Sequence, residues 1–177
     1  MEELKRFITK SIKQLISRDK LLFQIPTGEE QTLSSRKLHE VCINHRLAIY
    51  MENNLEDVNK ADYSVDIEYN RNFELVKRAR RNEDEDEIIV RPNILIHKRA
   101  NQDILTANYL VVEAKKGEPS LADKDKIERL MMDTRFKFKY GLTISYLKNP
   151  NFVICEIYFL DRNSNLQREF LPINKNE

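Results

Sequence analysis

The spacing of apolar residues changes along the chain and predicts where helices and strands lie. Between residues 3 and 23 the apolar positions fall on one helical stripe, which contains Phe7, Ile8, Ile12, Leu15 and Ile16. This spacing predicts an amphipathic helix, and the break from Pro26 to Gly28 ends it. A second helix is expected from about Leu33 to Leu55, where apolar residues again share one face.

Alternating or continuous apolar runs farther along the chain predict strands. They are Tyr63–Asn70, Ile88–His97, Asn108–Lys115, Phe136–Leu147 and, as the last strand, Phe152–Leu160. Ser120 and Asp123 form a capping-box pattern, which predicts a helix from about Leu121 to Thr134. The expected order is therefore α-α-β-β-β-α-β-β, which is typical of an α/β protein.

A charged connector follows the first predicted strand. Residues 71–87 contain the basic Lys77, Arg78, Arg80 and Arg81 and then the acidic run from Glu83 to Glu87. We interpret this segment as a solvated loop or a hairpin tip. The basic cluster is also a candidate clamp for a phosphate backbone.

Composition narrows the classes of function. The chain has 177 residues, 41% of them hydrophobic, which suits one domain or one domain with an appendage. The 30 basic and 29 acidic residues leave a net charge of +1, so a polyanionic partner would need a locally basic surface. There are three glycines and no GxxxxGK or GxGxxG pattern, which excludes the usual glycine-rich nucleotide loops.

The cysteines and the hydropathy pattern predict where the protein works. Cys42 and Cys155 are far apart in apolar surroundings, and we interpret both as buried free thiols rather than zinc ligands. No apolar run reaches the ~18 residues needed to span a bilayer. These features predict a reduced, cytoplasmic protein without a membrane span.

An acid and a base stand together at the end of a predicted strand that is otherwise apolar. Glu113 and Lys115 share one face because side chains alternate along a strand. If this strand pairs antiparallel with the preceding one, Asn93 neighbours Glu113. Glu40 falls within the apolar stripe of the second predicted helix. Glu40 either forms a structural ion pair or lies near the surface, or it reaches over the sheet into the same site.

Binding of a metal ion through oxygen ligands would explain this set of residues. Mg²⁺ prefers oxygen ligands and keeps several waters, so a few carboxylates suffice to bind it. The backbone carbonyl of Ala114 could supply a further oxygen. Lys115 could orient an attacking water or stabilise a pentavalent phosphorus.

A longer series of motifs carries a resemblance to a known family. In chain order it comprises Glu40 on a helix, Tyr69-Asn70-Arg71, RPNILIH from Arg91 to His97, NYLVVEAKK from Asn108 to Lys116, Asp123 with Lys126, and Tyr140-Gly141-Leu142. Over residues 33–147 this series resembles the PD-(D/E)XK nuclease superfamily. The resemblance implies a restriction-endonuclease-like α-β-β-β-α-β core with a mixed central sheet. Residues 26–177 would form this nuclease-like domain, and residues 1–25 an extra N-terminal amphipathic helix.

The resemblance also implies an activity and assigns residues to it. It implies Mg²⁺- or Mn²⁺-dependent cleavage of nucleic acid, DNA more often than RNA. The catalytic residues would be Glu113, Lys115, Asn93 and Glu40. The metal ligands would be Glu113, Asn93, Ala114 and Glu40, and the substrate contacts would be Lys116, Lys126, Arg71 and Arg91.

One residue departs from the family pattern. Asn93 stands after Pro92 where the motif has an aspartate, and an amide oxygen brings no negative charge to a cation. Three explanations stay open. Asn93 is an introduced substitution, or it marks a naturally non-cleaving member, or the site works with Asp66, Glu68 or Glu40 completing the ligand set.

Two readings other than a nuclease follow from the same sequence. The chain could be a catalytically inactive nuclease-fold module that binds or regulates without a metal. It could also be an interaction domain in which the N-terminal helix makes a homodimer.

Overall fold

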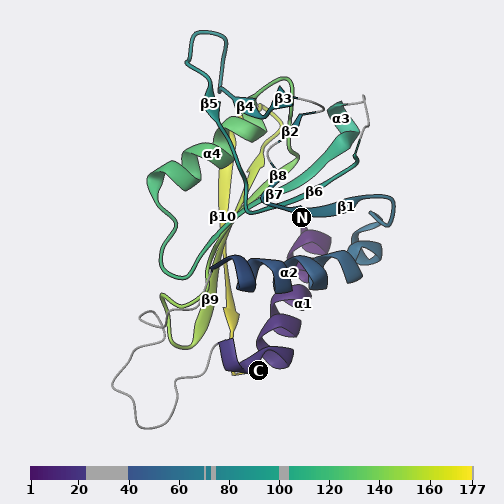
Figure 1. Cartoon of the computed structure of the whole chain (residues 1–177), viewed down its shortest axis with the longest axis vertical. Coiled ribbons are helices and arrows are strands. Elements are labelled where there is room, and N and C mark those ends of the chain that lie inside the picture. Colours follow the sequence, from purple (N-terminus) through teal and green to yellow (C-terminus); the bar gives the residue numbers. More distant parts are fainter. Residues whose placement is uncertain (23–39, 70, 73–74, 100–103, 177) are drawn as a thin grey trace.

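The computed structural model describes residues 1–22, 40–69, 71–72, 75–99 and 104–176, and its centre is a mixed six-stranded sheet (Figure 1). The strand order is β1-β6-β7-β8-β9-β10. The bounds are β1 Ser64–Ile67, β6 Ile94–His97, β7 Asn108–Lys115, β8 Tyr140–Ser145, β9 Phe152–Leu160 and β10 Leu166–Asn174. Neighbouring strands are antiparallel except β7 and β8, which are parallel and are connected through helix α4 (Leu121–Met132). The predicted α/β class and the antiparallel pairing of the strands that carry Asn93 and Glu113 are confirmed.

Two strand predictions were wrong in their bounds, and the strand Phe152–Leu160 has its predicted bounds but is not the last one. The run from residue 88 to 97 is two strands, β5 (Ile88–Ile89) and β6, because Pro92 between them has no N–H for a ladder. The strand expected from residue 136 begins at Tyr140, after a turn at Lys137 with a φ of 46°. β9 is not the last strand, because β10 follows it at the sheet edge, where exposed and half-buried side chains do not alternate regularly.

The connector after β1 is not only a solvated loop. It contains two small ladders, in which β2 (Arg71–Asn72) pairs with β3 (Leu75–Val76) and β4 (Arg78–Ala79) pairs with β5. Lys77, expected in solvent, is buried with 4% of its surface exposed. Its Nζ lies 5.5–5.7 Å from the ring centroids of Tyr69, Phe136 and Phe138, and ring faces attract a cation.

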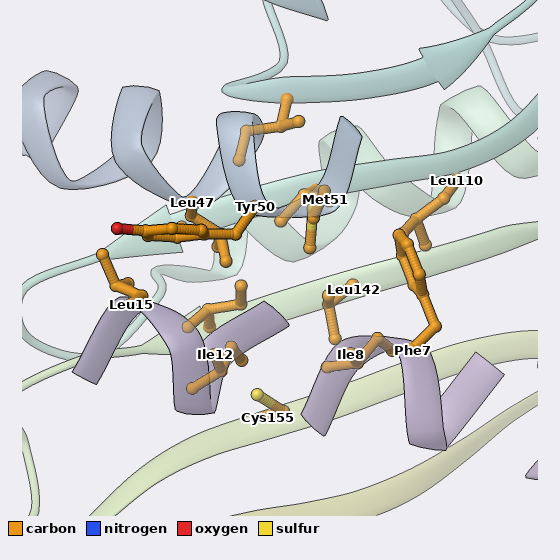
Figure 2. Close-up of a cluster of buried hydrophobic side chains, with 14 of the residues drawn as sticks. Phe7, Ile8, Ile12, Leu15, Leu47, Tyr50, Met51, Leu110, Leu142 and Cys155 are labelled. Atoms are coloured by element: carbon orange, nitrogen blue, oxygen red, sulfur yellow. The ribbon is translucent and has the colours of Figure 1, made fainter. Parts of the chain in front are cut away.

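Two helices cover one face of the sheet. They are α1 (Glu2–Arg18), close to its predicted bounds, and α2 (Glu40–Asn53). The predicted break at 26–28 and residues 33–39 of the second predicted helix lie outside the described residues. Figure 2 shows the apolar stripe of α1 meeting α2 and the sheet, with Phe7 and Ile8 near Leu110 and Leu142. The described ranges also contain the short helices η1 (Lys20–Leu22), η3 (Leu55–Val58) and α3 (Ile104–Ala107).

The cysteine prediction was half correct. Cys155 is buried in this core, but Cys42 is exposed, because it lies outside the apolar stripe of α2. Within the described part of the chain, no helix combines the length and the apolar character needed to cross a membrane.

Helix α4 covers the opposite face of the sheet (Figure 1). The predicted capping box is confirmed, since the side chains of Ser120 and Asp123 each accept a hydrogen bond from the other residue's backbone N–H. The helix passes directly over Gly141 of β8. A Cβ at Gly141 would lie 2.2 Å from Cγ2 of Ile127 and 2.9 Å from Sδ of Met131, so only glycine allows this close approach.

One side-chain direction differs from the simple alternation. Tyr109 was expected on the face of Glu113, but the β6–β7 pairing shifts register between Ile96 and His97. Tyr109 packs instead in the core shared by α1 and α2, with its ring 5.6 Å from that of Tyr140. A bulge of this kind changes the face to which the following side chain points.

Candidate functional site

The candidate residues meet at one end of β6 and β7, on the face of the sheet that carries α4. Ile94 pairs with Val112, so Asn93 stands next to Glu113, and Glu113 pairs with Thr143 of β8. Asn93 is 9% exposed and Glu113 is completely buried. The sequence-based expectation that these two side chains are neighbours is confirmed.

Glu113 is a buried carboxylate whose two oxygens have different surroundings. Its Oε1 accepts a hydrogen bond from Nζ of Lys126 at 2.8 Å, whereas its Oε2 has no hydrogen-bond partner among the residues that the structure describes. Burial raises the pKa of Glu113 to about 7, although the charge of Lys126 acts in the opposite direction. The carboxylate is therefore held where its charge is poorly compensated.

Asn93 uses its oxygen to hold the neighbouring strand. Its Oδ1 accepts a hydrogen bond of 2.8 Å from the backbone N–H of Ala114. An aspartate oxygen could accept the same bond and would leave a second, charged oxygen in the site. The present side chain offers an NH₂ group in that place.

Lys115 lies between two acids from different helices. Its Nζ is 3.4 Å from Oε1 of Glu40 and 3.7 Å from Oδ1 of Asp123. Burial lowers the pKa of Lys115, but the charges of Asp123 and Glu40 outweigh it and raise the pKa above its usual value. Lys115 is thus a firmly held ammonium whose side chain remains 32% exposed.

Glu40 is the first described residue of α2. It reaches the sheet, which is one of the two alternatives that the sequence left open. Besides Lys115, it accepts a 3.0 Å hydrogen bond from the backbone N–H of Lys116 at Oε2. Glu40 is therefore both a structural ion-pair partner and part of the candidate site.

Asp123 is a site residue that the sequence suggested only as a helix cap and as a motif counterpart. Its Oδ2 accepts hydrogen bonds from the backbone N–H and the hydroxyl of Ser120, at 2.9 and 2.7 Å. Its Oδ1 faces both lysines, 3.7 Å from Lys115 and 3.8 Å from Lys126. The signal that could have identified it is its spacing of three residues before Lys126, which puts both on one helix face.

Other candidates lie elsewhere. Arg91 is exposed and pairs with Glu68 at 2.7 Å. Asp66 pairs with His97, Nε2 to Oδ2, at 2.9 Å and with Arg99. Asp66 and Glu68 are thus each engaged by basic partners other than Lys115 and Lys126. Arg71 lies in β2, but its side chain is outside the described residues, so its predicted contact stays a prediction.

A metal ion would have few charged ligands here. Within the described ranges, no group of three or more His, Cys, Asp or Glu side chains is placed to hold one. The unpartnered oxygen of Glu113, the side-chain oxygen of Asn93 and the carbonyl of Ala114 are nevertheless the hard donors that Mg²⁺ takes. These residues fit a single cation, with less negative charge around it than an aspartate at position 93 would give.

Comparison with known proteins identifies no relative: no family model, no curated protein and no solved structure matches this chain. The geometry of the site itself is therefore the basis for assigning a function.

Proposed function

We propose that this chain is a metal-dependent nuclease that hydrolyses phosphodiesters of nucleic acid, DNA first and RNA second, and that Asn93 impairs it. The observation that carries the proposal is the completely buried Glu113 beside Asn93 and Lys115, since its Oε2 has no partner in the described part of the chain. A carboxylate buried in this way costs several kcal/mol. Such costs concentrate at functional sites, where a ligand compensates for them.

The fold supports the same proposal. In the mixed sheet, β7 and β8 are parallel neighbours that the crossover helix α4 connects. Helix α2 precedes the sheet in the chain. This order is compatible with a restriction-endonuclease-like α-β-β-β-α-β core formed by α2, β1, β6, β7, α4 and β8, to which α1, β9 and β10 are additions. The proposal includes membership of the PD-(D/E)XK nuclease superfamily.

Each residue then has a defined task. Glu113, Asn93 and the Ala114 carbonyl would hold Mg²⁺ or Mn²⁺. Glu40 would be a weaker ligand, because its oxygens already accept hydrogen bonds from Lys115 and Lys116. When bound, the cation would lower the pKa of a water and neutralise charge on the phosphate.

The lysines act on the substrate side. Lys115, oriented by Glu40 and Asp123, donates hydrogen bonds to a phosphate oxygen and stabilises the charge that develops there. Lys126 balances the charge of Glu113 before substrate arrives. Lys116 and Arg91, outside the buried group, would contact the nucleic-acid backbone farther from the reacting phosphate.

The proposal is tested by restoring the missing charge. We expect Asn93→Asp to cut plasmid DNA with Mn²⁺ at least about tenfold faster than the unaltered chain, because one carboxylate is added to the ligand set. The matched control is Asn93→Asp combined with Glu113→Gln, which should not cut. If neither the chain nor Asn93→Asp cuts DNA or RNA at any metal concentration, the nuclease proposal is wrong.

A second candidate is a non-catalytic nuclease-fold module that binds or regulates without metal. The observation that favours it is that Lys126 already pairs with Glu113 and that Ala114 N–H already occupies the oxygen of Asn93. Calorimetric titration with Mn²⁺ separates the two candidates. Binding heat that disappears in Glu113→Gln supports the nuclease, whereas no heat in either protein supports the module.

A further inference from the structure

Among the described residues, α4 covers only part of the sheet face on which it packs. Cross-strand partners form rows across it, and α4 covers the row that contains Gly141 and Tyr158. The next row toward the end of β7 runs from Glu113 through Thr143 and Glu156 to Phe170. Beyond α4 this row borders an open cavity of about 400 Å³, which is within the size range of ligand sites.

The floor of the cavity continues directly from the candidate site. Thr143 and Ser145 line it, and they are the β8 partners of Glu113 and Lys115. At the far side stands Phe170 of the edge strand β10, with 63% of its surface exposed. Three strand spacings of about 4.8 Å place Phe170 roughly 14 Å from Glu113.

The charges around the cavity are balanced. Lys124 pairs with Glu156 at 3.1 Å and Lys148 pairs with Glu118 at 2.6 Å. A neutral lining that combines an aromatic ring with polar side chains suits an uncharged, planar, hydrogen-bonding group better than it suits a phosphate. The Lys148–Glu118 pair is exposed, and such pairs contribute little, so Lys148 can turn to an adjacent phosphate.

We propose that this cavity receives an unpaired nucleobase of the strand being cut, stacked on Phe170, so that the substrate is single-stranded next to the reacting phosphate. The inference rests on the proposed function, because it is the candidate phosphodiester site that makes a neighbouring nucleotide the occupant. A base in a duplex is stacked on both faces and paired along its edge, so it must leave the helix before it can enter. Stacking on an aromatic side chain is tolerant of base identity, and every base has a face that can stack.

The cavity is tested by binding rather than by cleavage. Fluorescence anisotropy of a labelled oligothymidylate, an oligouridylate and a duplex of the same length, in EDTA, reports affinity while no metal supports cleavage. We expect the single strands to bind more tightly than the duplex, and Phe170→Ala to weaken single-strand binding about tenfold. Phe170→Trp should keep it. Because Phe170 is mostly exposed, its replacement leaves the core intact, and thermal melting verifies this.

A matched control and a direct readout make the result specific. Ile89→Ala removes an apolar side chain that is 59% exposed, on β5 away from the cavity, and should bind like the unaltered chain. An oligonucleotide with 5-iodouracil should crosslink to Phe170, as mapped by mass spectrometry. Equal affinity of Phe170→Ala and the unaltered chain, or a preference for duplex, would overturn the inference.

The outcome is separable from that of the proposed function. Cleavage of duplex DNA by Asn93→Asp together with unchanged binding by Phe170→Ala would overturn the cavity assignment and leave the nuclease. Phe170-dependent binding of single strands without cleavage in any variant would overturn the nuclease and support the cavity. If the chain binds no single strand at all, the cavity assignment is wrong.

Discussion

Replacing Glu113 with glutamine measures the cost of burying one carboxylate. In the folded chain burial raises the pKa of Glu113 to about 7, despite the opposing charge of Lys126, whereas an unfolded glutamate has a pKa of about 4.3. The folded state therefore holds the proton more tightly. Stability is therefore greatest below about pH 4, where the carboxyl is protonated in both states, and it is lost as the pH rises toward 7.

The size of the effect follows from these two pKa values. At ~1.36 kcal/mol per pKa unit, the carboxylate costs about 1 kcal/mol at pH 5 and about 3.5 kcal/mol at pH 8. Glutamine cannot lose a proton and avoids this change. We therefore expect the free energy of unfolding of Glu113→Gln, relative to that of the unaltered chain, to rise by about 2.5 kcal/mol from pH 5 to pH 8. The weaker contact of glutamine with Lys126 shifts this difference by the same amount at both pH values.

Urea unfolding in EDTA, followed by circular dichroism at the two pH values, gives the required free energies of unfolding. Glu83→Gln is the matched control. Its side chain is exposed, so this substitution should change the free energy of unfolding equally at both pH values. A difference between Glu113→Gln and the unaltered chain that stays constant from pH 5 to pH 8 would refute the reasoning.

Three further predictions concern the rest of the fold. Gly141→Ala should lower the free energy of unfolding by about 2 kcal/mol, because the new Cβ would lie 2.2 Å from an isoleucine side chain of α4. Gly117→Ala, where a Cβ meets nothing within 4 Å, should be neutral or slightly stabilising, and equal melting temperatures of the two variants would contradict this. Burial lowers the pKa of Lys77 to about 8, so Lys77→Met should stabilise the chain at pH 7 by about 2 kcal/mol once the ring contacts are allowed for. Urea unfolding should show this gain shrinking as the pH rises toward 10, where the unfolded lysine also loses its charge, and a gain independent of pH would rule the explanation out. Cys42 is exposed and should react with a thiol reagent in the native protein. Cys155 should react only after unfolding, because burial raises the pKa of its thiol, and rapid reaction of both thiols in native buffer would contradict the burial of Cys155.

Sequence periodicity was sufficient for the elements whose side chains pack on one clear face. The apolar stripes of α1 and α2 predicted much of the core, and the alternation around Glu113 predicted that Asn93 is its neighbour. Periodicity was insufficient at β10, an edge strand whose exposed residues give no strong alternation. It also missed the bulge at Tyr109, since a single inserted residue leaves no mark on composition.

The site was predictable in position but not in its pairings. That Asn93 would neighbour Glu113 followed from antiparallel pairing alone. That Lys126 would approach one Glu113 oxygen and leave the other without a partner depends on where α4 lies on the sheet. The position of α4 depends in turn on the close contact at Gly141, which involves residues distant in sequence. The burial of Lys77 among three rings depends on similar long-range contacts.

The two tasks of Asp123 have a consequence for how the site is assembled. One carboxylate oxygen closes the first turn of α4, and the other faces Lys115 and Lys126. A helix of 12 residues is marginal on its own, so its first turn becomes stable only as it docks on the sheet. Helix nucleation and delivery of the negative charge are thus a single folding event. A chain in which α4 has not formed therefore lacks the contacts of Asp123 and Lys126 with the residues of β7, although Glu113 and Lys115 are already on the sheet.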